Sequence, residues 1–420
     1  MTIAVDVESP PAARRWGRHA ATRVATIGDQ LLVALANFAL TVAIGRAFGA
    51  EEVASYGIGL SAGLMIQALQ RHAILIPLML QPAARVERRR GGVFAQHGLV
   101  LALVVLFGGG ALFFAHEAGI PRFGLLIVAA SAVCLLLYAE LEFARSILVK
   151  LNRPGLLFSS AAWYAAVSAG LALAAVNHVL IYEEVLAALA AAMLLHAVAI
   201  FMLARDFSPS LGFRLLLADM RRYGGWSLIA TLTYSGYNHL PLFILGALAP
   251  PVHAAAFVAT RSLLQPLQIL LRGLDVADKA MFSERAGAPH SRKAFTLTMQ
   301  LALLYAVTAG LFGAMAGIFA EDLLLVAYGE KFAGFGAALL AWVPVYVLMS
   351  VSLPFESLIY SRQAFGGYYL VRAIGSAVAI ALTAPLILPW AEVGAIAACG
   401  AGSFIAIAGT VILLLREPRQ

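Results

Sequence analysis

Long apolar runs separated by short polar connections restrict the fold of this chain more than any other feature. A helix needs roughly 20 apolar residues to cross a bilayer, and twelve such runs follow one another: 24–45, 53–80, 93–115, 123–144, 156–176, 185–204, 224–247, 254–276, 295–319, 337–360, 369–389 and 393–415. Only 12% of the 420 residues are charged and 62% are hydrophobic, whereas a soluble domain is about a quarter charged. The sequence therefore predicts an all-α integral membrane protein with about twelve transmembrane helices.

A weak internal repeat relates the first six runs to the last six. Segment 43–57 is echoed by 244–258 at an offset of 201 residues, which pairs Gly45 with Gly246, Ala54 with Ala255 and Tyr56 with Phe257. The same offset pairs Gln67 with Gln268 and Arg71 with Arg272. Such repeats are typical of transporters whose binding site lies between the two halves. We expect two pseudosymmetric six-helix bundles around a central cavity.

The distribution of basic residues predicts the orientation and the domain limits. Of the 29 Lys and Arg residues, 22 fall on one side of the predicted spans, three on the other and four inside spans. The positive-inside rule places the basic side and both termini in the cytoplasm, so the net charge of +7 reflects membrane orientation and not nucleic-acid binding. We predict an uncleaved N-terminal segment 1–23, bundles 24–204 and 224–415, a linker 205–223 and a tail 416–420. The linker is expected to form a short amphipathic helix that acts as a hinge and lipid anchor.

Arginines inside the predicted spans are the strongest candidates for a binding site. A charge at bilayer depth costs several kcal/mol unless it meets a partner or water. In the eighth span a spacing of 4, 3, 4 and 3 places five polar residues on one helix face: Arg261, Gln265, Gln268, Arg272 and Asp275. Gln67 and Arg71 form a shorter version in the second span. We predict that these faces line the cavity, although the glutamines could instead bond neighbouring helices and Arg272 could extend to lipid headgroups. Arg372 is likewise expected to extend to lipid headgroups.

Other polar residues inside spans extend the candidate site. Asn37 in the first span and Tyr234 and Asn238 in the seventh are predicted to contact substrate. Asp29, Glu140 and Glu356 are candidates for ion coupling, or for neutralising an arginine. Cys134 and Cys399 lie in apolar runs, and the histidines are scattered, so neither a disulfide, a metal site nor a cofactor is expected. The chain also lacks a phosphate-binding loop and a long external loop, so we expect no enzyme.

Three short segments resemble a known family. Gly28-Asp29-Gln30, together with the segment from Gly45 to Gly57, is similar to the first helix and following loop of bacterial polysaccharide-export proteins, which belong to the multidrug/oligosaccharidyl-lipid/polysaccharide (MOP) flippase superfamily. Segment 327–334, before the tenth span, resembles an external tyrosine-glycine segment of that family, and segment 392–397 resembles the one that opens its twelfth span. Two departures are the Val53-Ala54-Ser55 segment and Ala247 at the repeat position of Arg46.

The resemblance implies two six-helix bundles in the bacterial inner membrane that open alternately to its two faces. It implies an anionic lipid-linked oligosaccharide or related polysaccharide precursor as substrate. It also implies membrane lipids and the glycosyltransferases or polymerase of the same pathway as partners. Buried arginines suit a phosphate or diphosphate group. The alternative is a cation-coupled multidrug efflux pump of the same fold, whose cavity should be acidic and aromatic. A membrane-embedded glycan polymerase or ligase and a major-facilitator transporter fit less well.

Overall fold

The first half of the chain is a series of long helices. The computed structural model describes residues 12–204, 206–267, 271, 292–362 and 365–416. The helices of this half are α1 (Ala12–Ala47), α2 (Ala50–Gln70), η1 (Arg71–Leu75), α3 (Ile76–Leu80), α4 (Ala83–Arg88), α5 (Arg90–Glu117), α6 (Arg122–Lys150), α7 (Pro154–Val176) and α8 (Tyr182–Phe201).

The second half is also helical throughout its described residues. Its elements are α9 (Pro209–Asn238), α10 (Leu240–Leu248), α11 (Pro251–Leu263), α13 (Arg292–Ile318), α14 (Ala320–Tyr328), η2 (Glu330–Phe332), α15 (Gly336–Arg362) and α16 (Phe365–Arg416). The last element contains two helices, because the backbone of Ala391 leaves the helical region with φ 43°.

This helical architecture confirms the predicted fold class. Within the described residues, eight helices are long and apolar enough to cross a membrane, and one of them, α16, covers two predicted spans. The other predicted spans correspond to helices that are interrupted or only partly described. The second is divided into α2, η1 and α3, the seventh into α9 and α10, and the eighth begins with α11. The chain is a multi-pass membrane protein.

Prolines account for two of the interruptions. Pro77 has no N–H to donate to the carbonyl of residue 73, and its ring would clash with that carbonyl in a regular helix. The wider turn of the π-helical segment η1 accommodates this clash, and Arg71 is its first residue. Pro241 similarly follows the break at His239, which separates α9 from α10. Both predicted cavity helices of the second and seventh spans are therefore irregular near their polar residues.

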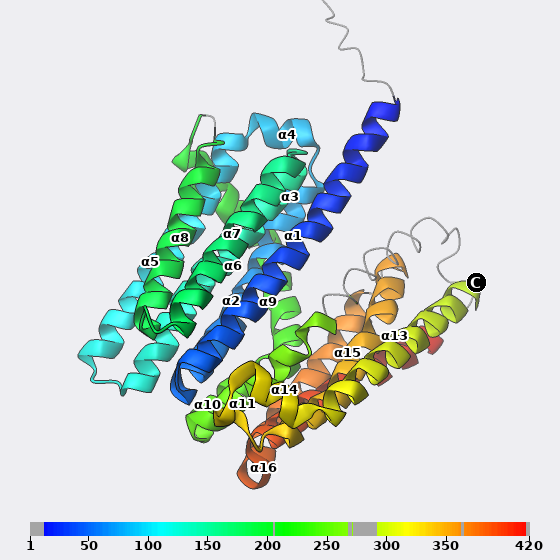
Figure 1. The fold of residues 1–420 in the computed structure, drawn as a ribbon. Coiled ribbons are helices and arrows are strands. Elements are labelled where there is room, and N and C mark those ends of the chain that lie inside the picture. Colours follow the sequence, from blue (N-terminus) through cyan, green and yellow to red (C-terminus); the bar gives the residue numbers. More distant parts are fainter. Residues whose placement is uncertain (1–11, 205, 268–270, 272–291, 363–364, 417–420) are drawn as a thin grey trace, which may run out of the picture.

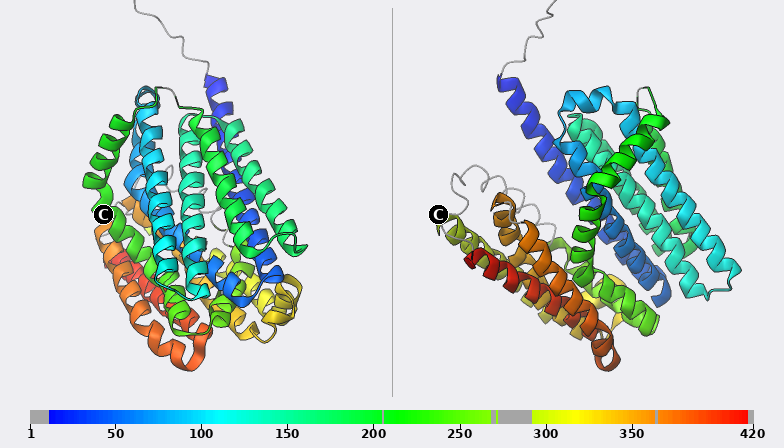
Figure 2. Two further views of the ribbon diagram at one scale, coloured as in Figure 1. Left: turned by 90° about the vertical axis from the view of Figure 1, so that its left-hand side faces the viewer. Right: turned by 180° about the vertical axis from the view of Figure 1, so that it is seen from behind.

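The helices form two lobes that meet at one end of the molecule. Figure 1 shows α1–α8 forming the N-lobe and α10–α16 forming the C-lobe. The two lobes converge near α10, α11 and α14, which we call the α14 end, and diverge toward α4 and the beginning of α1, the α4 end. The views in Figure 2 show the same arrangement from the side and from behind.

The internal repeat matches the contact between the lobes residue by residue. Helices α2 and α11 begin at Ala50 and Pro251, which are 201 positions apart, and they pack against each other. A methyl group at Gly57 would overlap the side chain of Val258, the residue that the same offset equates with Gly57. The repeat axis therefore passes close to this contact, where the lack of a side chain at Gly57 lets the two helices approach.

A second group of contacts joins the lobes at the same end. Gly45 at the end of α1 faces the ring of Tyr328 at the end of α14. Lys331 Nζ donates hydrogen bonds of 2.9 Å to the carbonyl oxygens of Arg46, in the last turn of α1, and Phe48, just after it. Cations suit the carbonyl end of a helix, so this lysine connects the two lobes across the α14 end.

Helix α9 belongs to both lobes. Its first half packs against α5 of the N-lobe, where Gly212 lies directly on the backbone of Ala95 and Gln96. Its second half packs against α16 of the C-lobe. Residues 209–223 of the predicted linker 205–223 and the start of the seventh span thus lie on a single helix, and the predicted boundary at 223 does not coincide with a break. The domain limits stay predictions.

Candidate functional site

A network of charged side chains lies inside the N-lobe. Glu142 on α6 accepts hydrogen bonds from Gln67 Nε2 at 2.8 Å, Arg71 Nε at 2.7 Å and Arg145 Nη1 at 2.9 Å. Arg145 also donates from Nε to Asp29 on α1. Two carboxylates therefore face two guanidinium groups. Glu142 and Arg145, on α6, lie at least 71 positions further along the chain than the other three residues, which α1, α2 and η1 supply.

Burial differs strongly within this network. The Glu142 side chain is only 4% exposed, whereas that of Arg71 is 47% exposed. A buried carboxylate must have its desolvation offset by close partners, and Glu142 has three. Arg71 is thus the member that presents a charged group to the outside of the lobe. The sequence predicts it for the site together with Gln67 and Asp29, but it does not predict Glu142 or Arg145.

The predicted site residue Asn37 lies in a separate polar contact of the N-lobe. Its Nδ2 lies 3.3 Å from the hydroxyl oxygen of Tyr138, and its Oδ1 accepts a hydrogen bond from the hydroxyl of Tyr164. The amide therefore uses both its donor and its acceptor on residues of its own lobe. This geometry joins α1 to α6 and α7 and gives Asn37 a role in packing.

The predicted coupling residue Glu140 lies in a buried cluster with two histidines. Glu140 Oε2 is 2.7 Å from His97 Nε2, and Oε1 is 2.9 Å from His196 Nδ1. The other ring nitrogen of His196 is 2.8 Å from Ser160 Oγ. These residues come from four consecutive helices, α5 to α8. The prediction that the histidines are isolated is wrong for this pair, since four helices bring together residues that the sequence scatters.

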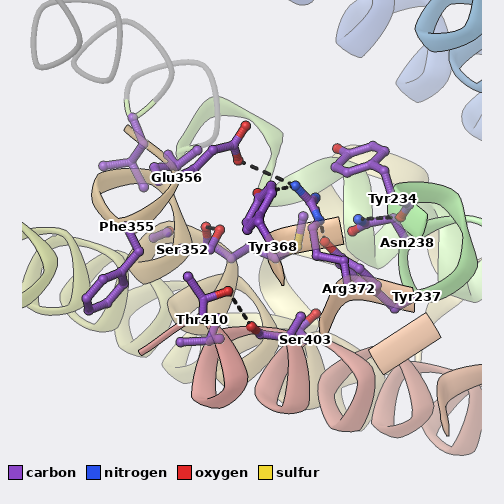
Figure 3. A pocket seen from close by; sticks show the side chains of 16 residues that line it. Tyr234, Tyr237, Asn238, Ser352, Phe355, Glu356, Tyr368, Arg372, Ser403 and Thr410 are labelled. Carbon is purple, nitrogen blue, oxygen red and sulfur yellow. Dashed lines mark hydrogen bonds and ion pairs between the residues drawn. The ribbon is translucent and has the colours of Figure 1, made fainter. Parts of the chain in front are cut away.

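A pocket in the C-lobe collects several of the remaining candidates. It lies among α9, α15 and α16, and its lining includes Tyr234, Asn238 and Glu356 (Figure 3). Hydroxyl groups add to the polar surface: Ser350, Ser352 and Thr410 line the same space. Aromatic, amide, hydroxyl and carboxylate groups are thus within one concave site, an arrangement that suits contact with a polar substrate.

Arg372 is the central charge of this C-lobe pocket. Its guanidinium carbon lies 5.3, 5.7 and 5.0 Å from the ring centres of Tyr234, Tyr237 and Tyr368. It donates from Nη2 to the hydroxyl of Tyr237 at 2.6 Å, and its Nη1 is 3.7 Å from Glu356 Oε2. The side chain is only 11% exposed. The expectation that Arg372 extends to lipid headgroups is therefore wrong, because tyrosine rings and hydroxyls hold it inside the lobe.

Arg261 lies beside the pocket but makes different contacts. Its Nη1 donates to the carbonyl oxygen of Asn238 at 2.8 Å, and its guanidinium carbon lies 5.4 Å from the ring centre of Trp342. No carboxylate of the described residues forms an ion pair with it. Gln265 lies just beyond α11 and is partly buried, while the predicted residues Gln268 and Arg272 lie outside the described residues.

The balance of charge differs between the two lobes. In the N-lobe network, Asp29 and Glu142 offset Arg71 and Arg145. In the C-lobe, Glu356 is the described carboxylate that lines the pocket with Arg372. The C-lobe pocket and the neighbouring Arg261 therefore have an excess of positive charge among the residues that the structure describes. Among all the residues that the structure describes, in both lobes, no group of three or more His, Cys, Asp or Glu residues could hold a metal ion.

Comparison with solved structures identifies the fold. A lipid II flippase, MurJ, in an inward closed conformation superimposes with a TM-score of 0.67 over 94% of this chain and 86% of that chain, at 14% identity. The chain has the MOP-superfamily fold. An inward-facing multidrug resistance MATE transporter of the MOP superfamily gives a TM-score of 0.60 over 94% of this chain and 96% of that chain, at 14% identity.

Another MOP transporter is of interest for its pocket. This protein, from Pyrococcus furiosus, is described by a reversed polarity of its binding pocket that suggests a different function, and it gives a TM-score of 0.57 over 95% of both chains at 15% identity. No protein-family model and no curated protein matches the sequence of our chain. The structural matches confirm the resemblance at the level of the MOP fold, while membership in the polysaccharide-export family stays a prediction.

Proposed function

We propose that this protein is an alternating-access transporter that moves an anionic lipid-linked oligosaccharide or related polysaccharide precursor across the bacterial inner membrane. The observation that carries the proposal is the excess positive charge at the C-lobe pocket. Arg261 and Arg372 are held by aromatic rings, hydroxyls and a carbonyl group, and the carboxylate of Glu356 offsets only one of the two charges. A phosphate or diphosphate group would supply the missing negative charge and accept several charge-assisted hydrogen bonds.

The remaining groups of the pocket suit the sugar part of such a substrate. Tyr234, Asn238 and Ser352 line the same space as Arg372, and their hydroxyl and amide groups can exchange hydrogen bonds with sugar hydroxyls. The lipid chain would stay in the bilayer. In this proposal the α4 end, which carries the predicted cytoplasmic loops, faces the cytoplasm, so the lobes diverge toward the inside of the cell. Glycosyltransferases or a polymerase of the same pathway would be partners.

Arg71 is the N-lobe residue that we assign to the space between the lobes. Its side chain is half exposed while its charge is anchored on Glu142, so it can present part of its guanidinium to an anionic headgroup. Thiol labelling of Arg71→Cys in membranes tests this assignment. We expect labelling from the cytoplasmic side, and complete protection in both orientations of the transporter would contradict it.

The main alternative is export of cationic drugs, because one neighbour of the fold is described as a multidrug resistance MATE transporter. Aromatic rings could stack on a cation. In this pocket, however, the guanidinium of Arg372 already lies over the rings of Tyr234, Tyr237 and Tyr368. A cationic drug would meet a like charge there, which favours the anionic substrate.

Binding measurements on the purified protein discriminate between the two functions. We expect a polyprenyl diphosphate lipid to raise the unfolding temperature more than a cationic dye does. Arg372→Gln should weaken binding of that lipid about 10- to 100-fold, since hydrogen bonds to a charged group contribute about 1.5–3 kcal/mol. Arg153→Gln, on the exposed surface just before α7, is the matched control. Stronger binding of the dye, or equal effects of both substitutions, would contradict the proposal.

A further inference from the structure

We propose that the buried cluster of His97, Glu140 and His196 is a proton-binding site whose occupancy changes as the two lobes move relative to each other. The inference rests on the proposed transport function for its purpose, although the site itself can be measured without any substrate. Its basis is geometric. Each oxygen of the Glu140 carboxylate faces a different imidazole nitrogen, at 2.7 and 2.9 Å.

The burial of the cluster fixes how many protons it can hold. Glu140 is 0% exposed, His97 2% and His196 5%. An ionised carboxylate in such a place needs a neutralising charge, and within the described residues only the two histidines pair with Glu140. One extra proton on the three groups makes the cluster neutral. Loss of that proton would leave a buried negative charge, and a second one would leave a buried positive charge.

His97 is the ring whose protonation depends most on conformation. Its Nε2 faces Glu140, but its Nδ1 is buried and has no hydrogen-bond partner among the described residues. His196, by contrast, uses both ring nitrogens, one on Glu140 and one on Ser160. A doubly protonated His97 would therefore carry an unsatisfied N–H in this conformation. A conformation that gives Nδ1 water or another acceptor would bind the second proton more tightly.

The arrangement of the donors favours a proton over a metal ion. The facing ring nitrogens of His97 and His196 are directed at two different oxygens of Glu140, and the carboxylate lies between them. A metal ion would need these nitrogens and a carboxylate oxygen to converge on one point. The geometry is instead that of a short chain of hydrogen bonds running from Ser160 through His196 and Glu140 to His97.

Several charged groups on the surrounding helices already have partners of their own. They include Asp29 on α1, Arg71 and His72 on η1, Glu87 on α4, Arg90 on α5, Glu142 and Arg145 on α6, and Asp219 on α9. Asp29, Arg71, Glu142 and Arg145 form the N-lobe network, and Arg90 pairs with Glu87 at 3.0 Å. His72 Nδ1 is bonded to the carbonyl of Ala68, and Asp219 to Gln96. Glu183 and Glu184 lie in the first turn of α8, several turns before His196 on the same helix. The cluster therefore has to balance its charge with its own protons.

The cluster lies against the helix that joins the two lobes. His97 follows Gln96, whose Nε2 donates to Asp219 of α9 at 2.8 Å. The imidazole of His97 stacks on Phe143 with a ring separation of 3.8 Å, and Phe201, which also faces it, contacts Phe207 just before α9. A change of charge at His97 thus acts at the contact between α5 and α9. A proton can shift a conformational equilibrium only if the two conformations bind it differently, and the proposal assigns that difference to this contact.

Spin labels on the two lobes test the proposal without substrate. Labels on cysteines replacing the exposed residues Arg88 on α4 and Arg292 on α13 report the separation of the lobes at the α4 end. We expect the distance distribution of the otherwise unchanged protein in lipid nanodiscs to shift with a midpoint within about pH 5–8, the range in which histidines titrate. Glu140→Gln removes the negative charge that stabilises protonated histidine in the cluster, so it should abolish this shift. Glu117→Gln, at the exposed end of α5, is the matched control and should leave the midpoint unchanged.

A spectroscopic measurement keeps the test decisive if Glu140→Gln fails to fold. Magnetic resonance of isotope-labelled histidine in the unsubstituted protein reports the protonation of His97 and His196 directly, with His97→Gln used for assignment. We expect one of the two rings to gain a proton over the same pH range as the distance change. A pH-independent distance distribution, an unchanged midpoint in Glu140→Gln, or rings that keep one protonation state throughout would overturn the proposal. A positive result combined with no binding of a polyprenyl diphosphate lipid would retain the proton site and refute the proposed substrate.

Discussion

The two lobes share a fold but neutralise their buried arginines in different ways. In the N-lobe, Arg145 is held between two carboxylates, and Glu142 has hydrogen-bond partners on α2, η1 and its own helix. In the C-lobe, Arg372 is held mainly by tyrosine rings and hydroxyls, with Glu356 at 3.7 Å. The first arrangement satisfies its charges internally, which suits a structural role. The second leaves a cation that an anionic ligand can still engage.

Replacing one glutamate by glutamine in each lobe should separate the structural role from the ligand-binding role most clearly. The larger effect is expected for Glu142 in the N-lobe. Glu142→Gln removes the carboxylate that Arg71 and Arg145 share, so Asp29 is left to offset Arg145 alone. Breaking a buried ion pair costs about 3–5 kcal/mol, and we expect a loss of that size in the free energy of unfolding. Denaturation in detergent, followed by fluorescence, measures it. A loss below about 1 kcal/mol, the upper range for an exposed pair, would mean that the N-lobe network is as open as the C-lobe pocket.

The contact at which the lobes meet should respond next most strongly. A methyl group introduced by Gly57→Ala would overlap Val258, and overpacking of this kind costs about 1–3 kcal/mol. Because the cost falls only on the conformation in which the lobes touch at the α14 end, we expect the population of that conformation to fall about 5- to 150-fold relative to the alternative. Cross-linking of cysteines at positions 48 and 331 reports the population.

A matched glycine substitution controls for effects on the helix alone. A methyl group at Gly110 on α5 would meet no atom within 4 Å. Gly110→Ala should therefore leave cross-linking unchanged, and it should stabilise the helix by up to about 1 kcal/mol. Equal losses of cross-linking in the two variants would show that the Gly57 contact does not control the arrangement of the lobes.

Glu356→Gln should have a smaller effect than Glu142→Gln on stability, and it should strengthen ligand binding. The Glu356 side chain is 22% exposed and 3.7 Å from Arg372, so the pair is expected to contribute less than about 1 kcal/mol to stability. Removing the carboxylate frees positive charge on Arg372. We expect binding of a polyprenyl diphosphate lipid to become up to about fivefold tighter, measured by titration in nanodiscs. Weaker binding would assign Glu356 to substrate contact instead.

The sequence predicts the helices well and the contacts between them poorly, for a physical reason. Each apolar run forms a helix because a bilayer satisfies backbone hydrogen bonds only within helices or closed barrels. The offset of 201 residues likewise equates Ala50 with Pro251, the first residues of α2 and α11. Such features depend on local sequence, so they can be read without knowing which helices are neighbours.

The site depends on which helices are neighbours. The sequence predicts Arg145 on the cytoplasmic side, beyond the end of a span, but α6 continues to Lys150 and buries Arg145 against Asp29 of α1. It predicts Arg372 at headgroups, yet Tyr237, 135 positions earlier, holds that side chain. Glu142 lies two residues after Glu140 within the same predicted span, so a second carboxylate at bilayer depth is a signal that points to the network. The tyrosine contacts of Arg372 leave no comparable signal.

The smallest of the expected effects concerns helix α9, which connects the two lobes. Its first half packs on the N-lobe and carries Asp219. Burial raises the pKa of Asp219, in the predicted linker, above its ordinary value, although the hydrogen bond from Gln96 acts in the opposite direction. The folded protein therefore favours protonated Asp219. Its contribution to stability is fully present below the unfolded pKa, about 3.8, and is lost as the pH rises through the folded pKa.

Asp219→Asn should remove this pH dependence while preserving the partner of Gln96. An asparagine oxygen can still accept the hydrogen bond, and the cost of burying a charge disappears. At neutral pH we expect a gain of less than about 1 kcal/mol, because the half-buried carboxylate is partly screened by water. Unfolding measured from about pH 4 to pH 7 compares the two proteins across the range in which a carboxylate with a raised pKa titrates. If Asp219→Asn instead destabilises the protein at neutral pH, the ionised carboxylate is what holds α9 on α5, and the connection between the lobes depends on charge in the same way as the N-lobe network.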